Sequence, residues 1–516
     1  MALMPVLGGL AMLSAYVDAK YSIRSDITQI RCMRRQAQYW QELCKERGDS
    51  DWSYYHTIHC TYGKNDYDEA LLFEDRSWTY SQFRGEIGRL AIAFQKLGMT
   101  NRTVVGMYIN NSPEFMLAWW ALFKIGAIPS PINTSVTEEP FRHCLRVSDS
   151  SFLLCSYELY EAANRSLTGH DVGPLEHVVL YDYDAYPKVP LADSVTLLVQ
   201  NQLDPLHPSM SDWPIETRPK VGPKDTSQYL YTSGTTGLPK ALIWPCGHAT
   251  LGASRHRWPM MFEKPRRTYI CTPMFHGGAA FALLPPTFST GGTIILARKF
   301  SRKNFWADMR RTRANMMFYI GEMIRYLVQA PADPMHPDEK NGHSLEVIYG
   351  LGLTAPVWKA FRERFGVPWI CEYYSASEGT GAISNSNWSN ERGVARVAHW
   401  GPLMRSSWFG QKTFYIIKID METMEVIRDP KTGLCLECMY DEVGEAVMRI
   451  APPLQRSHDY VGEKGKKATE EKLIADVFVK GDLFWRMGDA LSMVSSTQLF
   501  LNKHYANSCT RTRRVS

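Results

Sequence analysis

The stretch Tyr231-Thr232-Ser233-Gly234-Thr235-Thr236-Gly237-Leu238-Pro239-Lys240 is the most informative part of the sequence. Its two glycines permit tight backbone turns, its hydroxyl side chains offer donors, and Lys240 adds a positive charge, so the loop suits a polyphosphate. The Gly-to-Lys spacing differs from that of the ATPase P-loop. The loop also joins two β-rich runs, 228–232 and 241–244, and does not lead into a helix. On composition alone, a flexible surface turn is the alternative.

Outward from this loop, strand and helix patterns alternate. Residues 104–109 are rich in β-forming residues, and Ser112 and Pro113 then supply a helix N-cap and a proline at the first helical position. Gly126 is placed to end that helix. The same order returns with a strand at 346–349, a helix that ends at Gly366, and a strand at 368–373. This alternation predicts an α/β fold whose sheet is covered by helices. Residues 185–225, rich in Pro and Asp, predict a surface connection.

Composition excludes several classes of protein. The chain has 516 residues, of which 45% are hydrophobic and 22% charged, as in ordinary globular proteins. The net charge of +5 is too small to argue for a nucleic-acid partner. The eleven cysteines lack a framework spacing, which argues against a disulfide scaffold.

The N-terminal residues 1–17 carry no charge and approach the length of a membrane-spanning helix. Basic residues follow directly, so the positive-inside rule places the bulk of the protein in the cytosol. Residues 25–47 then show helical spacing, with Ser25 as a candidate N-cap. The face expected to be buried carries Ile27, Ile30, Met33, Ala37, Trp40 and Leu43. Packing on its own domain is the simpler interpretation of this helix, and contact of its basic residues with anionic lipid is the alternative.

As a whole, the 231–240 string closely resembles the phosphate-binding loop of the adenylate-forming enzymes, which include acyl-CoA synthetases, luciferases and peptide-synthetase adenylation domains. Further segments resemble one branch, the fatty acid transport protein / very long-chain acyl-CoA synthetase family. They include Thr272-Pro273-Met274-Phe275-His276, Tyr319-Ile320-Gly321-Glu322, Gly350-Leu351-Gly352-Leu353 and Glu372-Tyr373-Tyr374-Ser375-Ala376-Ser377-Glu378-Gly379. The resemblance extends from about residue 15 to about residue 491.

The resemblance implies a large domain of stacked mixed sheets with covering helices, plus a small distorted β-barrel subdomain. It implies an acid–thiol ligase that acts on long or very long chain fatty acids and requires ATP, Mg²⁺ and coenzyme A. It also implies that this activity is coupled to fatty acid uptake. A carboxylate would attack the α-phosphorus of ATP to give an acyl-adenylate and pyrophosphate. The coenzyme A thiol would then displace AMP.

The resemblance also implies roles for individual residues. ATP would be contacted by Tyr231, Thr232, Ser233, Gly234, Thr235, Thr236, Gly237 and Lys240, and the part from Ser233 to Lys240 would hold its β- and γ-phosphates. The adenosine part would be bound by Gly350, Gly352, Tyr374 and Asp489, with Tyr374 stacked on adenine and Asp489 on the ribose hydroxyls. Ser377, where the family usually has Thr, would reach the α-phosphate, and Glu378 would hold Mg²⁺. Lys240, Ser377 and Glu378 would be catalytic, and His276 would gate the acyl site.

After Leu491 the resemblance stops, whereas the family continues into a small C-terminal lid domain. We therefore expect a membrane anchor at 1–20, a large AMP-binding domain at 21–491 and a divergent, disordered tail at 492–516, with the lid domain absent. Two alternatives stay open. One is a truncated, catalytically impaired protein that binds ATP and acyl chains, and the other is a ligase for a specialised carboxylic acid in a biosynthetic pathway.

Overall fold

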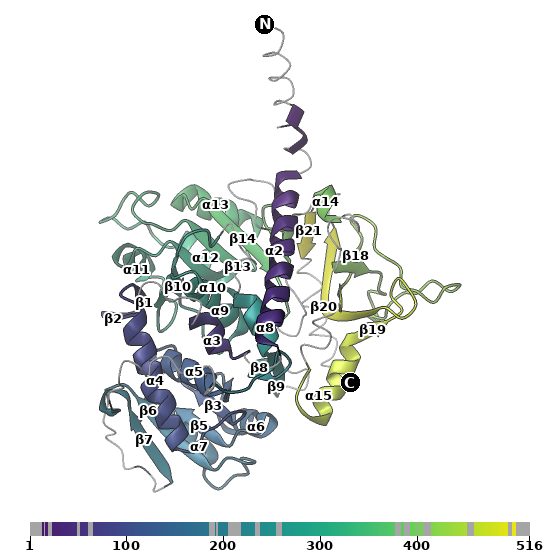
Figure 1. The fold of residues 1–516 in the computed structure, drawn as a ribbon. Coiled ribbons are helices and arrows are strands. Elements are labelled where there is room, and N and C mark those ends of the chain that lie inside the picture. Colours follow the sequence, from purple (N-terminus) through teal and green to yellow (C-terminus); the bar gives the residue numbers. More distant parts are fainter. Residues whose placement is uncertain are drawn as a thin grey trace.

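A computed structural model describes residues 13–14, 16–18, 23–48, 52–59, 66–184, 191, 194–204, 218–232, 238–253, 261–376, 383–385, 393–399, 401–405, 414–450, 459–493 and 498–501. Figure 1 shows two sheets with helices at the left, and a further sheet at the right. Among the described residues, no helix combines the length and apolarity needed to cross a membrane. Most of the uncharged 1–17 run lies outside the described residues.

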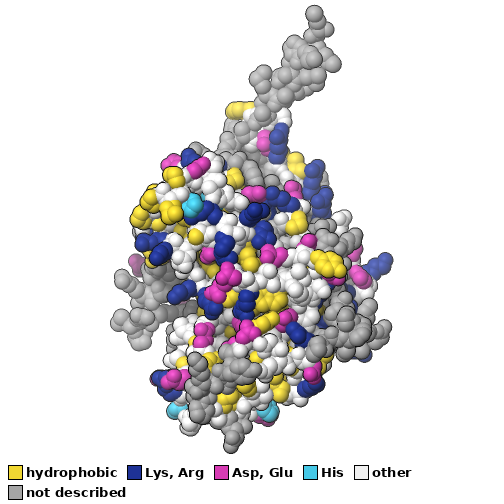
Figure 2. Space-filling view, turned by 90° about the vertical axis from the view of Figure 1, so that its left-hand side faces the viewer, with side chains coloured by type: hydrophobic (Ala, Val, Ile, Leu, Met, Phe, Trp, Pro, Cys, Tyr) yellow, Lys and Arg dark blue, Asp and Glu magenta, His cyan; other side chains and the backbone are white. Residues whose placement is uncertain are grey.

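An eight-stranded mixed sheet forms the centre of the molecule. Its strands run parallel from β14 to β1, and antiparallel strands β15 and β2 close its edges. In spatial order they are β15 (Ile383–Asn385), β14 (Trp369–Tyr374), β13 (Val347–Leu351), β12 (Met316–Ile320), β10 (Arg267–Ile270), β11 (Thr293–Leu296), β1 (Glu69–Phe73) and β2 (Arg76–Thr79). One face packs against α11 (Phe305–Thr312), α12 (Gly321–Val328) and α13 (Ala355–Phe365). Figure 2 shows the left-hand side of the molecule as drawn in Figure 1, and on this surface basic and acidic side chains are interspersed.

A second, five-stranded sheet is parallel throughout. Its strands are, in spatial order, β4 (Ile128–Pro131), β3 (Val104–Tyr108), β5 (Phe152–Cys155), β6 (His177–Asp182) and β7 (Val195–Val199). Helices α6 (Glu138–Ser148) and α7 (Tyr157–Leu167) pack on it. Strand β7, followed by the 3-10 turn Gln200–Gln202, lies within the stretch that we expected to be a surface connection. That expectation was wrong at residues 195–199, because β7 completes the edge of the sheet by pairing with β6.

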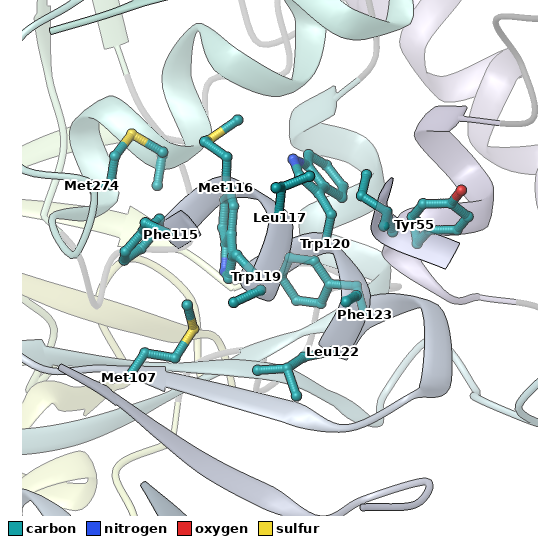
Figure 3. Packing of buried hydrophobic residues seen from close by; sticks show 14 of the residues in the cluster. Tyr55, Met107, Phe115, Met116, Leu117, Trp119, Trp120, Leu122, Phe123 and Met274 are labelled. Atoms are coloured by element: carbon teal, nitrogen blue, oxygen red, sulfur yellow. The ribbon is translucent and has the colours of Figure 1, made fainter. Parts of the chain in front are cut away.

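Helices α4 (Tyr80–Lys96) and α5 (Pro113–Ile125) lie between the two sheets, as Figure 1 shows. The start and end of α5 are as predicted: the Ser112 hydroxyl caps the Phe115 amide, and Gly126 adopts a φ of 75°. Nearly all of the side chains of α5 are buried. Figure 3 shows Trp119, Trp120 and Phe123 packed among neighbours from several elements. A helix enclosed on both sides buries its whole circumference.

A two-stranded hairpin and a C-terminal sheet complete the fold. Strands β8 (Thr226–Thr232) and β9 (Lys240–Pro245) form the antiparallel hairpin, which confirms the strand-to-strand setting of the 231–240 string. The C-terminal sheet contains β16 (Ala398–His399), β21 (Gln498–Leu501), β20 (Leu483–Met493), β18 (Val443–Arg449), β17 (Phe414–Ile417) and β19 (Leu473–Ala475). Other helices are α3 (Tyr54–His59), α8 (Cys246–Ala253), α9 (Gly277–Ala282), α10 (Leu284–Ser289), α14 (Pro402–Arg405) and α15 (Gly462–Lys472).

Two boundary predictions need correction. Residues 492–516 were expected to be disordered, but β20 continues to Met493 and β21 pairs with it at Leu499, Phe500 and Leu501. The expectation was therefore wrong at residues 492–493 and 498–501, which form strands, and the other residues of the expected tail lie outside the described residues. Helix α2 (Ile23–Arg47) begins two residues before the expected cap Ser25. It buries Ile30 and Leu43 against the domain, while Ile27 and Met33, expected to be buried, are exposed.

Candidate active site

The segments expected to bind nucleotide follow neighbouring parallel strands. Strands β10, β12, β13 and β14 share one direction, so their carboxyl ends lie at one edge of the sheet. The segment at 272–276 follows β10, the glycine-containing turn at 350–353 follows β13, and Tyr374 ends β14. Ligands in open α/β sheets collect at this edge. The tertiary structure thus brings together motifs that are far apart in the sequence.

The turn at 350–353 is shaped by its glycines. Gly350 lies beside Tyr319 of β12, and a Cβ at Gly350 would collide with the Tyr319 backbone. Gly352 has a φ of 85°, a conformation that favours glycine. The geometry of the fold therefore requires both glycines, and their expected contact with adenine is a separate, additional role.

Tyr374 and Asp489 are direct neighbours, although they belong to different sheets. The Tyr374 hydroxyl donates a hydrogen bond to Asp489 Oδ2 at 2.9 Å. Tyr374 is buried, and its ring meets Phe414 edge-on at 6.3 Å between ring centroids. Asp489 lies on β20 and is half-buried. The two residues expected to contact adenine and ribose thus meet where the central sheet touches the C-terminal sheet.

The β8–β9 hairpin is attached to α6 at both ends of its loop. The Tyr231 hydroxyl donates to the carbonyl of Cys144 at 2.7 Å and accepts a bond from Ser130 Oγ, also at 2.7 Å. His143 Nε2 donates to the Pro239 carbonyl at 3.0 Å. Burial raises the pKa of Tyr231 well above its ordinary value, so the hydroxyl stays protonated. Because its hydrogen bonds are made within the protein, the Tyr231 hydroxyl stabilises the hairpin and does not bind a ligand.

Lys240 begins β9, and Thr232 ends β8 opposite it. The Lys240 ammonium lies 5.6 Å from the centre of the Tyr460 ring. Tyr460 itself pairs with Leu242 of the hairpin. The expected phosphate-binding residues Ser233, Gly234, Thr235, Thr236 and Gly237 lie outside the described residues, as do Ser377 and Glu378. Within the described ranges, no group of His, Cys, Asp or Glu side chains could hold a metal ion.

His276 precedes α9 and is exposed. Partial burial of its ring lowers the pKa of the imidazole, so the neutral form prevails at pH 7. A Cβ added at Gly277 would meet Leu230 of β8, and one added at Gly278 would meet Phe318 of β12 and the Tyr373 hydroxyl. The His276 turn therefore lies between the hairpin and the carboxyl edge of the central sheet. The apolar side chains that follow, Phe281, Leu284 and Phe288, are packed in the core.

Three residues at the site escaped the sequence reasoning. Asn111, three residues after the end of β3, donates to the carbonyls of Thr272 and Ala297 and accepts from the Met274 amide at 2.8 Å, so it fixes the segment before His276. His143 holds Pro239, and the buried Glu372 holds the turn at 350–353. The position of Asn111 after a buried strand is a sequence signal that could have identified it as a site residue. Nothing in the sequence identified the partners of His143 or Glu372.

The fold is that of the adenylate-forming enzymes. The structure resembles a long-chain-fatty-acid-CoA ligase from Archaeoglobus fulgidus with a TM-score of 0.67 and 18% identity, over 87% of this chain and 84% of that one. It also resembles an anthranilate CoA ligase solved with anthranoyl-AMP, with a TM-score of 0.64 and 17% identity, over 87% of this chain and 77% of that one. The AMP-binding enzyme family matches residues 62–433, and the chain belongs to this family.

Curated relatives narrow the similarity. Isopenicillin N epimerase component 1 of Hapsidospora chrysogena is 31% identical over 93% of this chain and 69% of its own length. A very long-chain fatty acid transport protein of Cochliobolus heterostrophus is 29% identical over 94% of this chain and 71% of its own. Human long-chain fatty acid transport protein 1 is 31% identical over 81% of this chain and 61% of its own.

Proposed function

We propose that this protein is an ATP-dependent fatty acid–CoA ligase of the AMP-forming type, acting on long or very long chain acids. Membership of the AMP-binding enzyme family and relatives named as fatty acid transport proteins support this proposal. So does a relative of Mycobacterium tuberculosis named as a medium/long-chain-fatty-acid–CoA ligase, 29% identical over 82% of this chain and 64% of its own. The observation that carries it is the Tyr374–Asp489 contact beside the glycine turn at the carboxyl edge of the sheet.

The described residues suit the nucleotide half of this reaction. Asp489 offers a carboxylate that would accept hydrogen bonds from ribose hydroxyls. Within the turn at 350–353, Gly352 presents backbone without a side chain, against which a flat base would lie. Lys240 would neutralise charge on the leaving pyrophosphate. Because a carboxylate is a poor acyl donor, transfer of AMP to it supplies the leaving group for attack by the coenzyme A thiol.

Binding of Mg²⁺ and coenzyme A is proposed from the family, and not from the geometry of the described residues. Glu378, the proposed Mg²⁺ ligand, lies outside the described residues. The ion would offset charge on the phosphates. We assign no step to it.

A pair of product assays tests the proposal. The purified full chain is supplied with ATP, Mg²⁺, coenzyme A and a panel of acids that differ in chain length, and release of pyrophosphate is measured beside thioester formation. We expect both products, with a preference for long chains. Binding of ATP without formation of either product, for any acid, would favour the impaired acyl- and ATP-binding protein instead.

A second candidate is a ligase for a specialised carboxylic acid. It is favoured by the relative named for isopenicillin N, which matches 93% of this chain. The same panel separates the two candidates when it includes amino-acid-derived and aromatic acids. Thioester formation with one such acid, but not with long-chain fatty acids, would establish the second.

We further propose association with a membrane surface through α2. On its N-terminal half, Arg24, Ile27, Arg31, Arg34 and Arg35 are exposed, and their spacing places them on one face of the helix. Arginines around an exposed apolar residue suit an anionic lipid surface. With the helix at the membrane, the catalytic domain would lie on the cytosolic side.

A further inference from the structure

A buried carboxylate lies beneath the turn at 350–353. Glu372, on β14, is 3% exposed. Its Oε1 accepts hydrogen bonds from the amides of Gly352 at 2.5 Å and Leu353 at 2.9 Å, and its Oε2 accepts one from the Tyr319 hydroxyl at 2.6 Å. A buried carboxylate persists only where donors compensate for its desolvation. These donors come from the ends of two neighbouring strands.

The strand register explains how Tyr319 reaches Glu372 across an intervening strand. Tyr319 of β12 is opposite Gly350 of β13, which is opposite Glu372 of β14, so all three lie on one face. A Cβ at Gly350 would lie 2.7 Å from Cγ of the Tyr319 ring. Because Gly350 has no side chain, the Tyr319 side chain can cross β13 at this position and reach Glu372. Burial, together with the charge of Glu372, raises the pKa of Tyr319, which keeps the donated proton in place.

The contacts determine the shape of the turn. The N–H and C=O of one trans peptide point in opposite directions. Two amides that point at Glu372 therefore direct the carbonyls of Leu351 and Gly352 away from it. The Gly352 carbonyl faces Gly321, where any Cβ would collide with it. The turn is held from both sides, while Leu351 at its start is 37% exposed.

We propose that Glu372, oriented by Tyr319 across Gly350, is the positioning residue that fixes the adenine-binding turn at 350–353. This inference rests on the proposed function, because that function places adenine on the turn. Glu372 touches no substrate; it acts through the peptide planes that present the Leu351 carbonyl in a fixed direction. A carbonyl of fixed direction accepts from the amino group of adenine but not from hypoxanthine, which carries an oxygen at that position.

The test compares nucleotide binding by variants of the full chain. Glu372→Gln keeps the side-chain shape and removes the charge, and Tyr319→Phe removes only the orienting hydroxyl. Glu86→Gln is the matched control: Glu86 is also buried and accepts from a tyrosine, Tyr183, at 2.8 Å, but it lies on α4 away from the site. Calorimetry gives the dissociation constants for AMP and IMP, and thermal unfolding reports stability.

We expect Glu372→Gln to weaken AMP binding by about tenfold or more, because charge-assisted bonds to the turn are lost. IMP binding should change less, so that the preference for AMP narrows. Tyr319→Phe should show the same pattern with a smaller change. Glu86→Gln should lower the unfolding temperature and leave both constants unchanged.

Two results would overturn the inference. If a folded Glu372→Gln variant binds AMP and IMP with the same dissociation constants as the wild type, the carboxylate only stabilises the fold. If Glu372→Gln does not fold, the same result with Tyr319→Phe decides against the inference. A wild-type chain that binds neither ATP nor AMP would overturn the proposed function itself, and the inference with it.

Discussion

At the scale of single residues, the hydrogen bond from Tyr374 to Asp489 lies at the centre of the proposed nucleotide site. Replacing Asp489 with Ala removes the carboxylate that we expect to bind ribose. The affinity for AMP should fall by about 1–3 kcal/mol, as for other hydrogen bonds to charged groups. Titration calorimetry on the folded variant measures the change.

Tyr374→Phe is the natural companion, since it keeps the ring and removes only the hydroxyl bonded to Asp489. Its effect on AMP binding should be smaller than that of Asp489→Ala. An Asp489→Ala variant with unchanged affinity would contradict the ribose role.

A pH-dependent ion pair at the start of β13 offers a second prediction at this scale. Burial raises the pKa of Glu346, but hydrogen bonds from Lys264 and Arg266 outweigh it, and the net result is a pKa below the ordinary value of 4.5. The stabilisation is therefore complete above pH 4.5 and is lost as the pH falls through the lower, folded-state pKa. Glu346→Gln should cost about 1 kcal/mol at neutral pH, since the carboxylate is partly exposed. In urea titrations the variant and wild type should converge in acid; a constant difference would contradict the assignment.

A buried carboxylate helps to hold helix α2 to the domain. Asp26 is fully buried and accepts hydrogen bonds from the amides of Gly401, Leu403 and Met404 at the start of α14. Asp26→Ala leaves these amides without that acceptor and should lower the free energy of unfolding by about 2 kcal/mol or more. Asp26→Asn, which retains one acceptor oxygen, should lose less. Urea unfolding measures both, and equal losses would show that the charge does not matter.

The exposed face of α2 gives the second prediction at the scale of elements. Reversing Arg31, Arg34 and Arg35 to Glu should weaken binding to vesicles that contain anionic lipid by about 1 kcal/mol or more per arginine. Vesicle sedimentation at low salt measures this. The control reverses three exposed basic residues after β11: Lys299, Arg302 and Lys303. Equal losses in the two triple variants would show that total charge, and not α2, determines binding.

At the scale of the whole molecule, the proposed nucleotide site would join three parts of the fold, because its residues come from the hairpin, the central sheet and the C-terminal sheet. A ligand that bridges these parts binds the folded state alone. AMP at about 100 times its dissociation constant should therefore raise the free energy of unfolding by about 2.7 kcal/mol. Denaturant unfolding with and without AMP tests this, with pyrophosphate as a second ligand. Stabilisation of one transition only, in a curve with two, would show that the sheets unfold separately.

Much of the local structure could be predicted from the sequence. The cap at Ser112, the proline at the first turn and the stop at Gly126 define α5 because they act within a few residues of one another. The same holds for the β8–β9 hairpin and for the strand–turn–helix units around Gly350 and Gly366. The α/β class follows from such local patterns, whereas the nucleotide motifs follow from the resemblance to the adenylate-forming enzymes, with which the family assignment agrees.

Other features were decided only by tertiary structure. Strand β7, Val195–Val199, has a β-forming sequence, but its pairing with β6 is decided by the sheet, as is the pairing of β21 with β20. Tyr319, Gly350 and Glu372 lie far apart in the sequence and meet only through the register of three parallel strands. Parallel pairing uses backbone groups that every residue carries, so the residues alone do not specify which positions will be neighbours. The sequence by itself determined most helices and strands and the functional groups that they carry. The packing of the sheets decided which of these groups lie close enough to act together.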